Sequence, residues 1–255
     1  MLADYLTAFD SISLVTALVL MITAFVTALF TAAMGVGGGV LLLAVLASTV
    51  PVHALIPVHG LVQLGANGNR ALMTVRHLDR AVFCYFLAGA LAGAIVASFV
   101  IVQLPVIWIQ LAVATFILFL VWGPKPDIRE TSASGYVAAG GITTLISMFV
   151  GAAGPLVAAF IHRNYDDKLR LTATFAACMT VQHALKGVVF TFVGFAIYQW
   201  AFLILAMVIS GTLGTWVGLK MLVRIPTGHF KRAFKWIVTL LALRLLYQVG
   251  CTLFY

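Results

Sequence analysis

Charged residues are scarce in this chain. They make up 9% of its 255 residues, whereas soluble domains carry roughly 25%. Acidic residues are scarcer still, because seven Asp and Glu stand against fifteen Lys and Arg. Hydrophobic residues account for 63% of the chain. This composition excludes a water-soluble fold and predicts a protein that lies in a lipid bilayer.

Motifs for cofactors, metals and nucleic acids are also missing. Three cysteines, Cys84, Cys178 and Cys251, are far apart and form no C-x-x-C pair, so we expect small core side chains rather than metal ligands. The glycine run at 35–39 follows an apolar segment instead of a strand, which argues against a dinucleotide site. The net charge of +8 comes from short loops and fits orientation in a membrane better than nucleic-acid binding. We therefore predict no enzyme activity, no cofactor and no metal.

The chain is rich in apolar runs of about 20 residues, the length of a helix that spans a bilayer. They predict about eight long apolar helices, at residues 12–33, 54–74, 81–101, 105–122, 133–150, 168–193, 200–222 and 230–254. Two short apolar segments, 40–48 and 155–162, are each about half a membrane long. Each follows a glycine-rich break, Gly35–Gly39 or Gly151–Pro155. The expected fold is an all-α integral membrane protein.

A weak internal repeat relates the two halves of the chain. One shift aligns the two breaks and also brings polar residues of two later helices into register; the aligned pairs are Gly39 with Pro155, Asn67 with His183, and Arg70 with Lys186. After a few inserted residues, the run at 102–105 matches the run at 223–226, and both end in proline. This ordered series predicts two repeats, residues 1–125 and 126–255, that together form one transmembrane domain.

Loop charges indicate that the two repeats have opposite orientations. Cytoplasmic loops hold the excess of Lys and Arg; the loop at 75–80 carries Arg76 and Arg80, whereas its counterpart at 194–199 has no charge. Such a flip is the signature of inverted-topology repeats. Each repeat is then a re-entrant helix hairpin plus three transmembrane helices, and both termini lie outside. The alternative is eight spanning helices, in which 12–33 and 133–150 cross the membrane completely.

The two glycine breaks are the predicted substrate site. Unwound backbone within a bilayer is tolerated only where protein or a water-filled cavity satisfies it, and equivalent breaks of inverted repeats meet near the midplane. A short helix that begins at each break points its free N–H groups and positive dipole end at the centre. Since no Asp or Glu lies in a predicted spanning segment, we expect the substrate to be an anion. Glycines that merely allow close helix packing are the alternative.

Polar side chains on two helices complete this predicted site. His59, Gln63, Asn67 and Arg70 form one stripe at helical spacing. We expect Arg70 and Lys186 to attract the anion or to control its entry at the two opposite openings of the site. Arg70 could also reach the cytoplasmic interface. His59 and His183 are candidates for coupling transport to protons. The predicted substrate-binding residues are Gly35, Gly37, Gly38, Gly39, Gln63, Asn67, Arg70, Gly151, Gly154, Pro155, Gln182, His183 and Lys186.

The run Ala33–Gly39, the second glycine break and the polar second helix resemble the sulfite exporter family TauE/SafE over nearly the whole chain. That family comprises bacterial and plant membrane transporters linked to sulfite, organosulfonates and other small organic anions. The resemblance implies a multi-pass protein of a bacterial inner membrane. Its implied partners are a small anionic substrate and the lipid bilayer, with protons as a candidate coupling ion.

The resulting hypothesis is a secondary transporter, an exporter by its resemblance, that alternates access to a midplane site. A passive anion channel would use the same residues without accumulating its substrate. A membrane-embedded enzyme would need a convergent catalytic or metal cluster. A purely structural subunit would leave the polar stripes and the paired breaks unexplained.

Overall fold

The computed structural model describes residues 12–34, 37–100, 106–124, 131–161, 165–221 and 228–254. These residues form helices joined by short turns, and no strand occurs among them. The long helices are α2 (Leu14–Met34), α4 (Val52–Thr74), α5 (Arg80–Val100), α6 (Val106–Trp122), α7 (Ala133–Val150), α9 (Lys168–Phe192), α10 (Ile197–Met221) and α11 (Gly228–Phe254). The short ones are α3 (Gly38–Ala47), α8 (Gly154–Ile161) and the 3₁₀ turn η2 (Val75–His77). The predicted all-α fold is confirmed.

Five helices, α2, α5, α7, α9 and α10, are long and apolar enough to cross a membrane. The helices α3 and α6 are apolar but shorter. Helix α4 differs from these because its interior carries His59, Gln63, Asn67 and Arg70. The helices therefore agree with an integral membrane protein in which α4 has to be shielded from lipid.

Glycines at positive φ interrupt the chain in both halves. Gly37, with a φ of 113°, directly precedes α3, and Gly151, with a φ of 86°, directly follows α7. Residues with a side chain rarely adopt such angles, so a regular helix does not continue through either position. Gly35, which belongs to the predicted first break, lies outside the described residues. As a result α3 and α8 begin as separate short helices.

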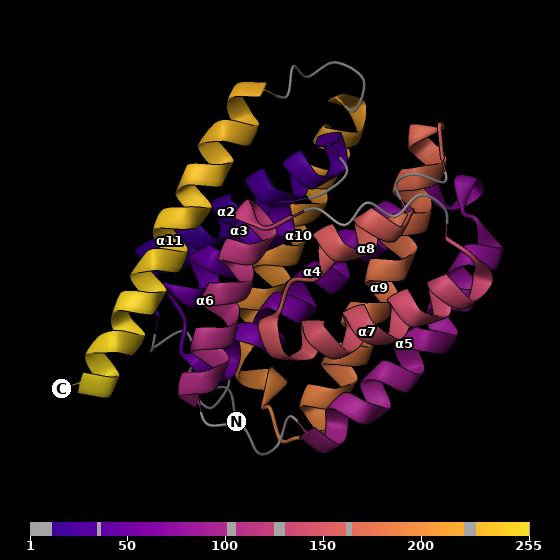
Figure 1. Cartoon of the computed structure of the whole chain (residues 1–255). Coiled ribbons are helices and arrows are strands. Elements are labelled where there is room, and N and C mark those ends of the chain that lie inside the picture. Colours follow the sequence, from indigo (N-terminus) through magenta and orange to yellow (C-terminus); the bar gives the residue numbers. More distant parts are fainter. Residues whose placement is uncertain are drawn as a thin grey trace.

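The helices α4 and α9 form the central pair (Figure 1). On either side of them, α10 packs against α4 and α5 packs against α9. Two outer pairs, α2 with α10 and α5 with α7, make the most extensive helix contacts of the described structure. At one edge of the molecule α6 packs along α11. The polar face of α4 is therefore enclosed by protein.

Glycines bring the helices of both outer pairs into backbone contact. A Cβ on Gly93 of α5 would lie 2.3 Å from the carbonyl oxygen of Gly141 on α7. A Cβ on Gly214 of α10 would lie 2.1 Å from the carbonyl oxygen of Phe25 on α2. Small residues at helix crossings are a common means of association in membranes. A larger side chain fits at neither position unless the two helices move apart.

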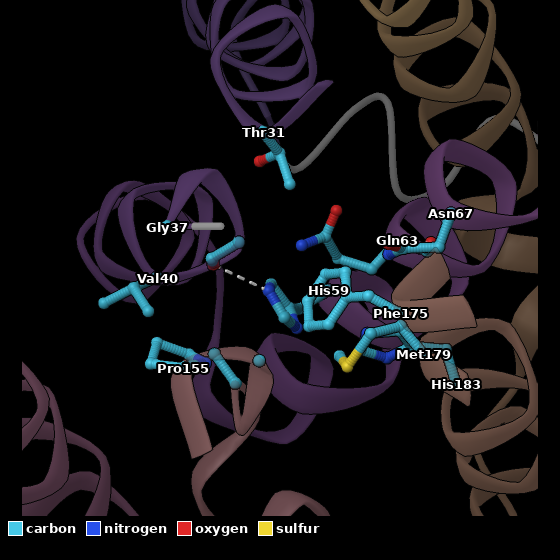
Figure 2. A pocket seen from close by; sticks show the side chains of 13 residues that line it. Thr31, Gly37, Val40, His59, Gln63, Asn67, Pro155, Phe175, Met179 and His183 are labelled. Carbon is cyan, nitrogen blue, oxygen red and sulfur yellow. Dashed lines mark hydrogen bonds between the residues drawn. The ribbon is translucent and has the colours of Figure 1, made fainter. Parts of the chain in front are cut away.

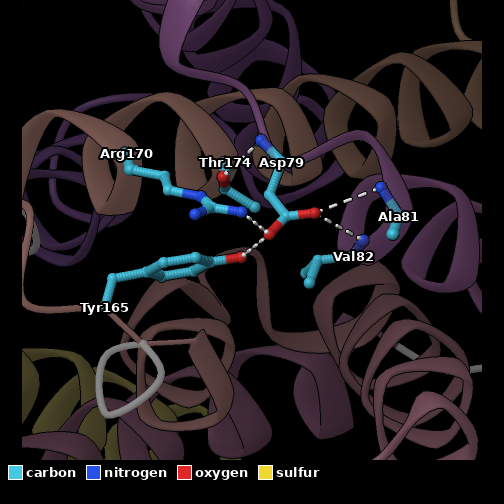
Figure 3. A network of polar contacts seen from close by, with 6 residues as sticks. All are labelled: Asp79, Ala81, Val82, Tyr165, Arg170 and Thr174. Carbon is cyan, nitrogen blue, oxygen red and sulfur yellow. Dashed lines mark hydrogen bonds and ion pairs between the residues drawn. The ribbon is translucent and has the colours of Figure 1, made fainter.

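At one end of the molecule, a carboxylate joins the turn before α5 to the start of α9 (Figure 3). One oxygen of Asp79 accepts the backbone N–H groups of Ala81 and Val82. The other accepts the Tyr165 hydroxyl and the Arg170 guanidinium, both at 2.8 Å. Partial burial alone would raise the pKa of Asp79, but the hydrogen bonds from Tyr165, the Val82 amide and Arg170 outweigh it and hold this pKa below its ordinary value. The network thus stabilises the ionised carboxylate.

We expect Gly214→Ala to destabilise the protein, because the new methyl group would push α10 away from the carbonyl oxygen of Phe25. The loss should be about 1–3 kcal/mol, although Ala is roughly 1 kcal/mol better than Gly in a helix. Thermal unfolding of the detergent-purified protein measures it. Gly250→Ala on α11 is the matched control, since a Cβ there meets no atom within 4 Å. An equal loss in both variants would contradict this account of the packing.

Asp79→Asn should lower the melting temperature at neutral pH and lose that effect in acid. Because the folded-state pKa of Asp79 is depressed, its stabilisation is present above the unfolded-state pKa of about 3.9 and disappears as pH falls through the folded-state value. The Arg170 side chain is 54% exposed, so solvent screening keeps the loss near ~1 kcal/mol.

Melting curves of both proteins from neutral pH down to about pH 3 test this expectation. Repeating the substitution in an Arg170→Gln background should give a smaller loss, because the ion pair is already gone. A difference between the two proteins that does not shrink at all between neutral pH and the lowest pH would show that the charge of Asp79 is not what stabilises the turn.

Candidate functional site

A small pocket lies between α4 and α9, at the starts of α3 and α8 (Figure 2). Its volume is about 20 Å³, which is room for about one water molecule. The residues that line it are Thr31, Gly37, Gly39, Val40, His59, Gln63, Asn67, Ala152, Gly154, Pro155, Phe175, Met179 and His183. The structure thus brings together eight residues that the sequence pattern predicts as site residues or proton-coupling candidates: Gly37, Gly39, His59, Gln63, Asn67, Gly154, Pro155 and His183.

One wall of the pocket is the polar stripe of α4. His59 is fully buried, and its Nε2 lies 2.9 Å from the carbonyl oxygen of Gly39. The amide of Gln63 lies against Gly39, where a Cβ would come within 2.2 Å of Nε2 of Gln63. One turn further, the Asn67 side chain donates to the Gln63 carbonyl oxygen at 2.8 Å. A side chain at position 39 would therefore displace the Gln63 amide from its place beside the break.

The opposite wall is formed where the two broken segments meet. Gly37 and Gly39 reach the pocket from the first half of the chain, and Gly154 and Pro155 reach it from the second. Leu43 of α3 also packs on Gly151, where a Cβ would lie 2.6 Å from Cδ1 of the leucine. The N-terminal ends of α3 and α8 therefore share one pocket, and such ends carry partial positive charge and free N–H groups.

His183 contributes unpaired polar atoms to this pocket. Its ring lies edge-on to the ring of His59, with 5.9 Å between centroids. The side chain is fully buried, and neither ring nitrogen has a hydrogen-bond partner within the described part of the chain. In a neutral imidazole one of these nitrogens is a donor and the other an acceptor. His183 can therefore donate a hydrogen bond to a group that enters the pocket.

Two predicted residues on α9 lie beside the pocket and face α7. The Lys186 amine donates to the carbonyl oxygen of Gly151 at 2.5 Å. The Gln182 amide donates to the hydroxyls of Thr143 and Thr144, at 3.1 and 3.2 Å. Both side chains are fully buried. Gln182 thus reaches α7, and Lys186 lies between α4 and the turn that follows α7.

Arg70 and Gly38 also lie outside the pocket lining. The Arg70 side chain is 1% exposed, and its Nε and Nη1 atoms have no hydrogen-bond partner among the residues that the structure describes. It is a buried cation rather than a surface residue. Gly38 packs against α2, because a Cβ there would lie 2.0 Å from the carbonyl oxygen of Thr27.

Five lining residues were not among the predicted site residues: Thr31, Val40, Ala152, Phe175 and Met179. A signal for two of them does exist in the sequence. The shift that aligns Gly39 with Pro155 also aligns His59 with Phe175 and Gln63 with Met179. Because these partners are apolar, a search for polar stripes passes over them.

The electrostatic character of the region is positive to neutral. None of the described helices contains Asp or Glu, and the carboxylate of Asp79 is held at one end of the molecule. Within the described ranges, no group of three His, Cys, Asp or Glu side chains is placed to hold a metal ion. The arrangement offers amide, imidazole and backbone N–H donors next to the buried basic side chains of Arg70 and Lys186, which suits an oxyanion.

Comparison with known protein families supports this assignment. Residues 20–245 match the family described as Sulfite exporter TauE/SafE. No curated protein and no solved structure gives a significant match. The matched range contains both glycine breaks and both central helices, and with the apolar helices it makes the chain a multi-pass membrane protein. The chain belongs to the sulfite exporter TauE/SafE family.

Proposed function

We propose that this protein is a secondary transporter that exports a small anion, such as sulfite or an organosulfonate, by alternating access to the pocket between α4 and α9. The observation that carries the proposal is the wall of this pocket, which combines buried donors and two helix N-termini with no carboxylate among its lining residues. The family match supports transport of a sulfur oxyanion.

An oxyanion would accept hydrogen bonds from groups that otherwise have no partner. His183 presents an unpaired ring nitrogen, and a buried donor without an acceptor costs about 1–3 kcal/mol. Gln63 holds its amide beside Gly39, and α3 and α8 add backbone N–H groups. Binding an anion would recover part of that free-energy cost, so the pocket should prefer a negatively charged ligand.

The size of the pocket supports alternating access over a permanently open channel. At about 20 Å³ it holds about one water molecule, whereas sulfite has four non-hydrogen atoms. An anion can therefore enter only if the helices around the pocket move apart. A pore that stays open would need a continuous path of larger radius, so the channel alternative finds no support in this conformation.

Helix packing supports the proposed inverted repeat. Each outer pair has a close backbone approach at a glycine, Gly93 to Gly141 in one pair and Gly214 to Phe25 in the other. The shift that aligns the glycine breaks also aligns Phe25 with Gly141, and the shift that aligns the two Pro-ended runs also aligns Gly93 with Gly214. Equivalent positions therefore make equivalent contacts, with each repeat supplying one helix to each pair.

The two ends of the central helix pair differ. At one end the Asp79 network ties the turn before α5 to the start of α9. At the other end, the first turns of α4 and the last turn of α9 border a cavity of about 380 Å³, lined in part by His53, Pro57 and Phe190. Loop charges assign the Asp79 end to the cytoplasm. This conformation is thus closed at the cytoplasmic end and hollowed at the outer end.

His183→Phe should weaken anion binding without loosening the fold. The ring shape is kept and the unpaired nitrogens are removed, so the melting temperature without ligand should stay the same or rise. Affinity for sulfite should fall about 10–100-fold, the effect of losing a hydrogen bond to a charged group. Thermal-shift titration with sulfite, sulfate, thiosulfate, methanesulfonate and acetate measures both quantities.

His77→Phe is the matched control, because His77 lies exposed in η2 and should leave the affinity unchanged. If no anion stabilises the wild-type protein, the proposed function is wrong. If His183→Phe binds sulfite as tightly as the wild type, the pocket between α4 and α9 is not the binding site.

Orientation can be tested with single cysteines in a variant that lacks Cys84, Cys178 and Cys251. Asp166→Cys and Arg76→Cys lie at the end assigned to the cytoplasm, whereas Tyr198→Cys lies at the other end. A membrane-impermeant maleimide added to intact cells should label only Tyr198→Cys, and opening the cells should expose the other two. Labelling of all three in intact cells, or the reverse pattern, would contradict the proposed topology.

A further inference from the structure

The Lys186 side chain is fixed inside the protein. It is fully buried in the C-terminal half of α9, and its one hydrogen bond within the described residues goes to the carbonyl oxygen of Gly151, at 2.5 Å. The aliphatic stem packs on Gly60 of α4, where a Cβ would lie 2.7 Å from Cδ of the lysine. Because the stem is held between two helices, the amine cannot reach the membrane interface as an exposed lysine would.

Within the described residues, no acidic side chain pairs with Lys186. The titratable groups that face it are His59 on α4 and His183 on its own helix. The other helices that pack on α9, namely α5, α7 and α8, contain no Asp or Glu. Arg70, the other buried basic residue of the centre, lies further along α4, about 15 Å from Gly60 by helix rise. In the described part of the chain, the amine meets a carbonyl dipole, that of Gly151, and no carboxylate.

The surroundings of the amine are polar but incompletely paired. An ammonium has three N–H donors, and one of them is used on Gly151. Ser147 Oγ and Gln182 Oε1 are buried and have no partner in the part of the chain that the structure describes. Ser147 lies one turn before Gly151 on α7, and Gln182 lies one turn before Lys186 on α9. The interface between α7 and α9 therefore offers acceptors for the ammonium form of Lys186, provided that an opposite charge balances it.

The negative charge that balances the Lys186 ammonium can come from the pocket. Gly151, which accepts the hydrogen bond from Lys186, is followed by Ala152 in the pocket wall, and His183 of the wall lies one turn before Lys186 on α9. A buried charge is costly unless an opposite charge accompanies it. An anion in the pocket supplies that opposite charge, so anion binding and proton binding at Lys186 must favour each other.

We infer that Lys186 is the coupling residue of this transporter: its amine takes up a proton when the anion binds and gives it up when the anion leaves. The proposal rests on the anion-transport function proposed above and assigns the coupling ion. The step is one of protonation only, in which the amine becomes an ammonium with a proton from the water on the side to which the pocket is open. A singly charged anion that moves with this proton transfers no net charge.

Isothermal titration of the detergent-purified full chain with sulfite tests the proposal. Titrations in two buffers of different ionisation heat give the number of protons taken up per bound anion. Between about pH 6 and pH 9, the wild type should take up one proton more per sulfite than Lys186→Arg or Lys186→Met. Sulfite titrates in this range too, but its own contribution is common to all variants and cancels in the difference.

The two variants should differ from each other in affinity. Lys186→Arg keeps a permanent positive charge, so it should bind sulfite without the extra proton. Lys186→Met keeps the length of the stem and removes the charge, so its affinity should fall at least about tenfold, the effect of losing one charged partner. Lys168→Met, the same substitution at an exposed position on the same helix, should match the wild type in affinity and in proton number.

Sulfite binding with equal proton uptake in the wild type, Lys186→Arg and Lys186→Met would overturn the coupling role and leave the transport function standing. Failure of the wild type to bind any anion would instead remove the transport function and the coupling role with it. If neither variant folds, proton uptake is measured for methanesulfonate binding to the wild type. The charge of methanesulfonate does not change over the pH range of the titrations, so any proton taken up goes to the protein. Methanesulfonate binding without proton uptake would overturn the proposal.

Discussion

A helix in a membrane has to satisfy its own backbone hydrogen bonds, and this fold depends on the two places where the helices stop short. At Gly37 and Gly151 the backbone leaves helical geometry, and the nearby carbonyl groups need donors from elsewhere. The structure supplies them from the central helices, because His59 pairs with the Gly39 carbonyl and Lys186 pairs with the Gly151 carbonyl. The polar residues of α4 and α9 are therefore structural partners of the breaks as well as candidates for substrate binding.

That requirement explains the layout of the remaining helices. Helices that carry buried imidazole, amide and cationic groups cannot face lipid, so α4 and α9 have to be surrounded. The outer pairs α2 with α10 and α5 with α7 do this, and they close tightly because Gly93 and Gly214 allow backbone contact. Loss of this contact would loosen the enclosure and expose the polar centre, so the glycines of the outer helices and the polar residues of the inner ones depend on one another.

The sequence predicts the elements well because each has a local signal. Apolar runs give the long helices, glycine-rich breaks give α3 and α8, and the spacing of His59, Gln63 and Asn67 predicts one shared face. The placement of Gln182 and Lys186 toward α7 could not be predicted, because it depends on how α9 rotates against its neighbours. The Asp79 network could not be predicted either, because its partners Tyr165 and Arg170 lie in the other half of the chain.

The two halves differ in their side chains, and this difference affects the energies of the states that such a transporter would adopt. A repeat that exchanges its conformations gives two states with equivalent backbones, but the side chains here are not equivalent. The shift that aligns the breaks pairs His59 with Phe175, Gln63 with Met179 and Asp79 with Phe195. The pocket therefore draws its hydrogen-bonding side chains mainly from α4, and the carboxylate network closes only one end of the molecule. Under the alternating access proposed above, a state closed by an ionic network at one end and a state closed without one at the other would differ in energy, and that difference would set which side the resting protein faces.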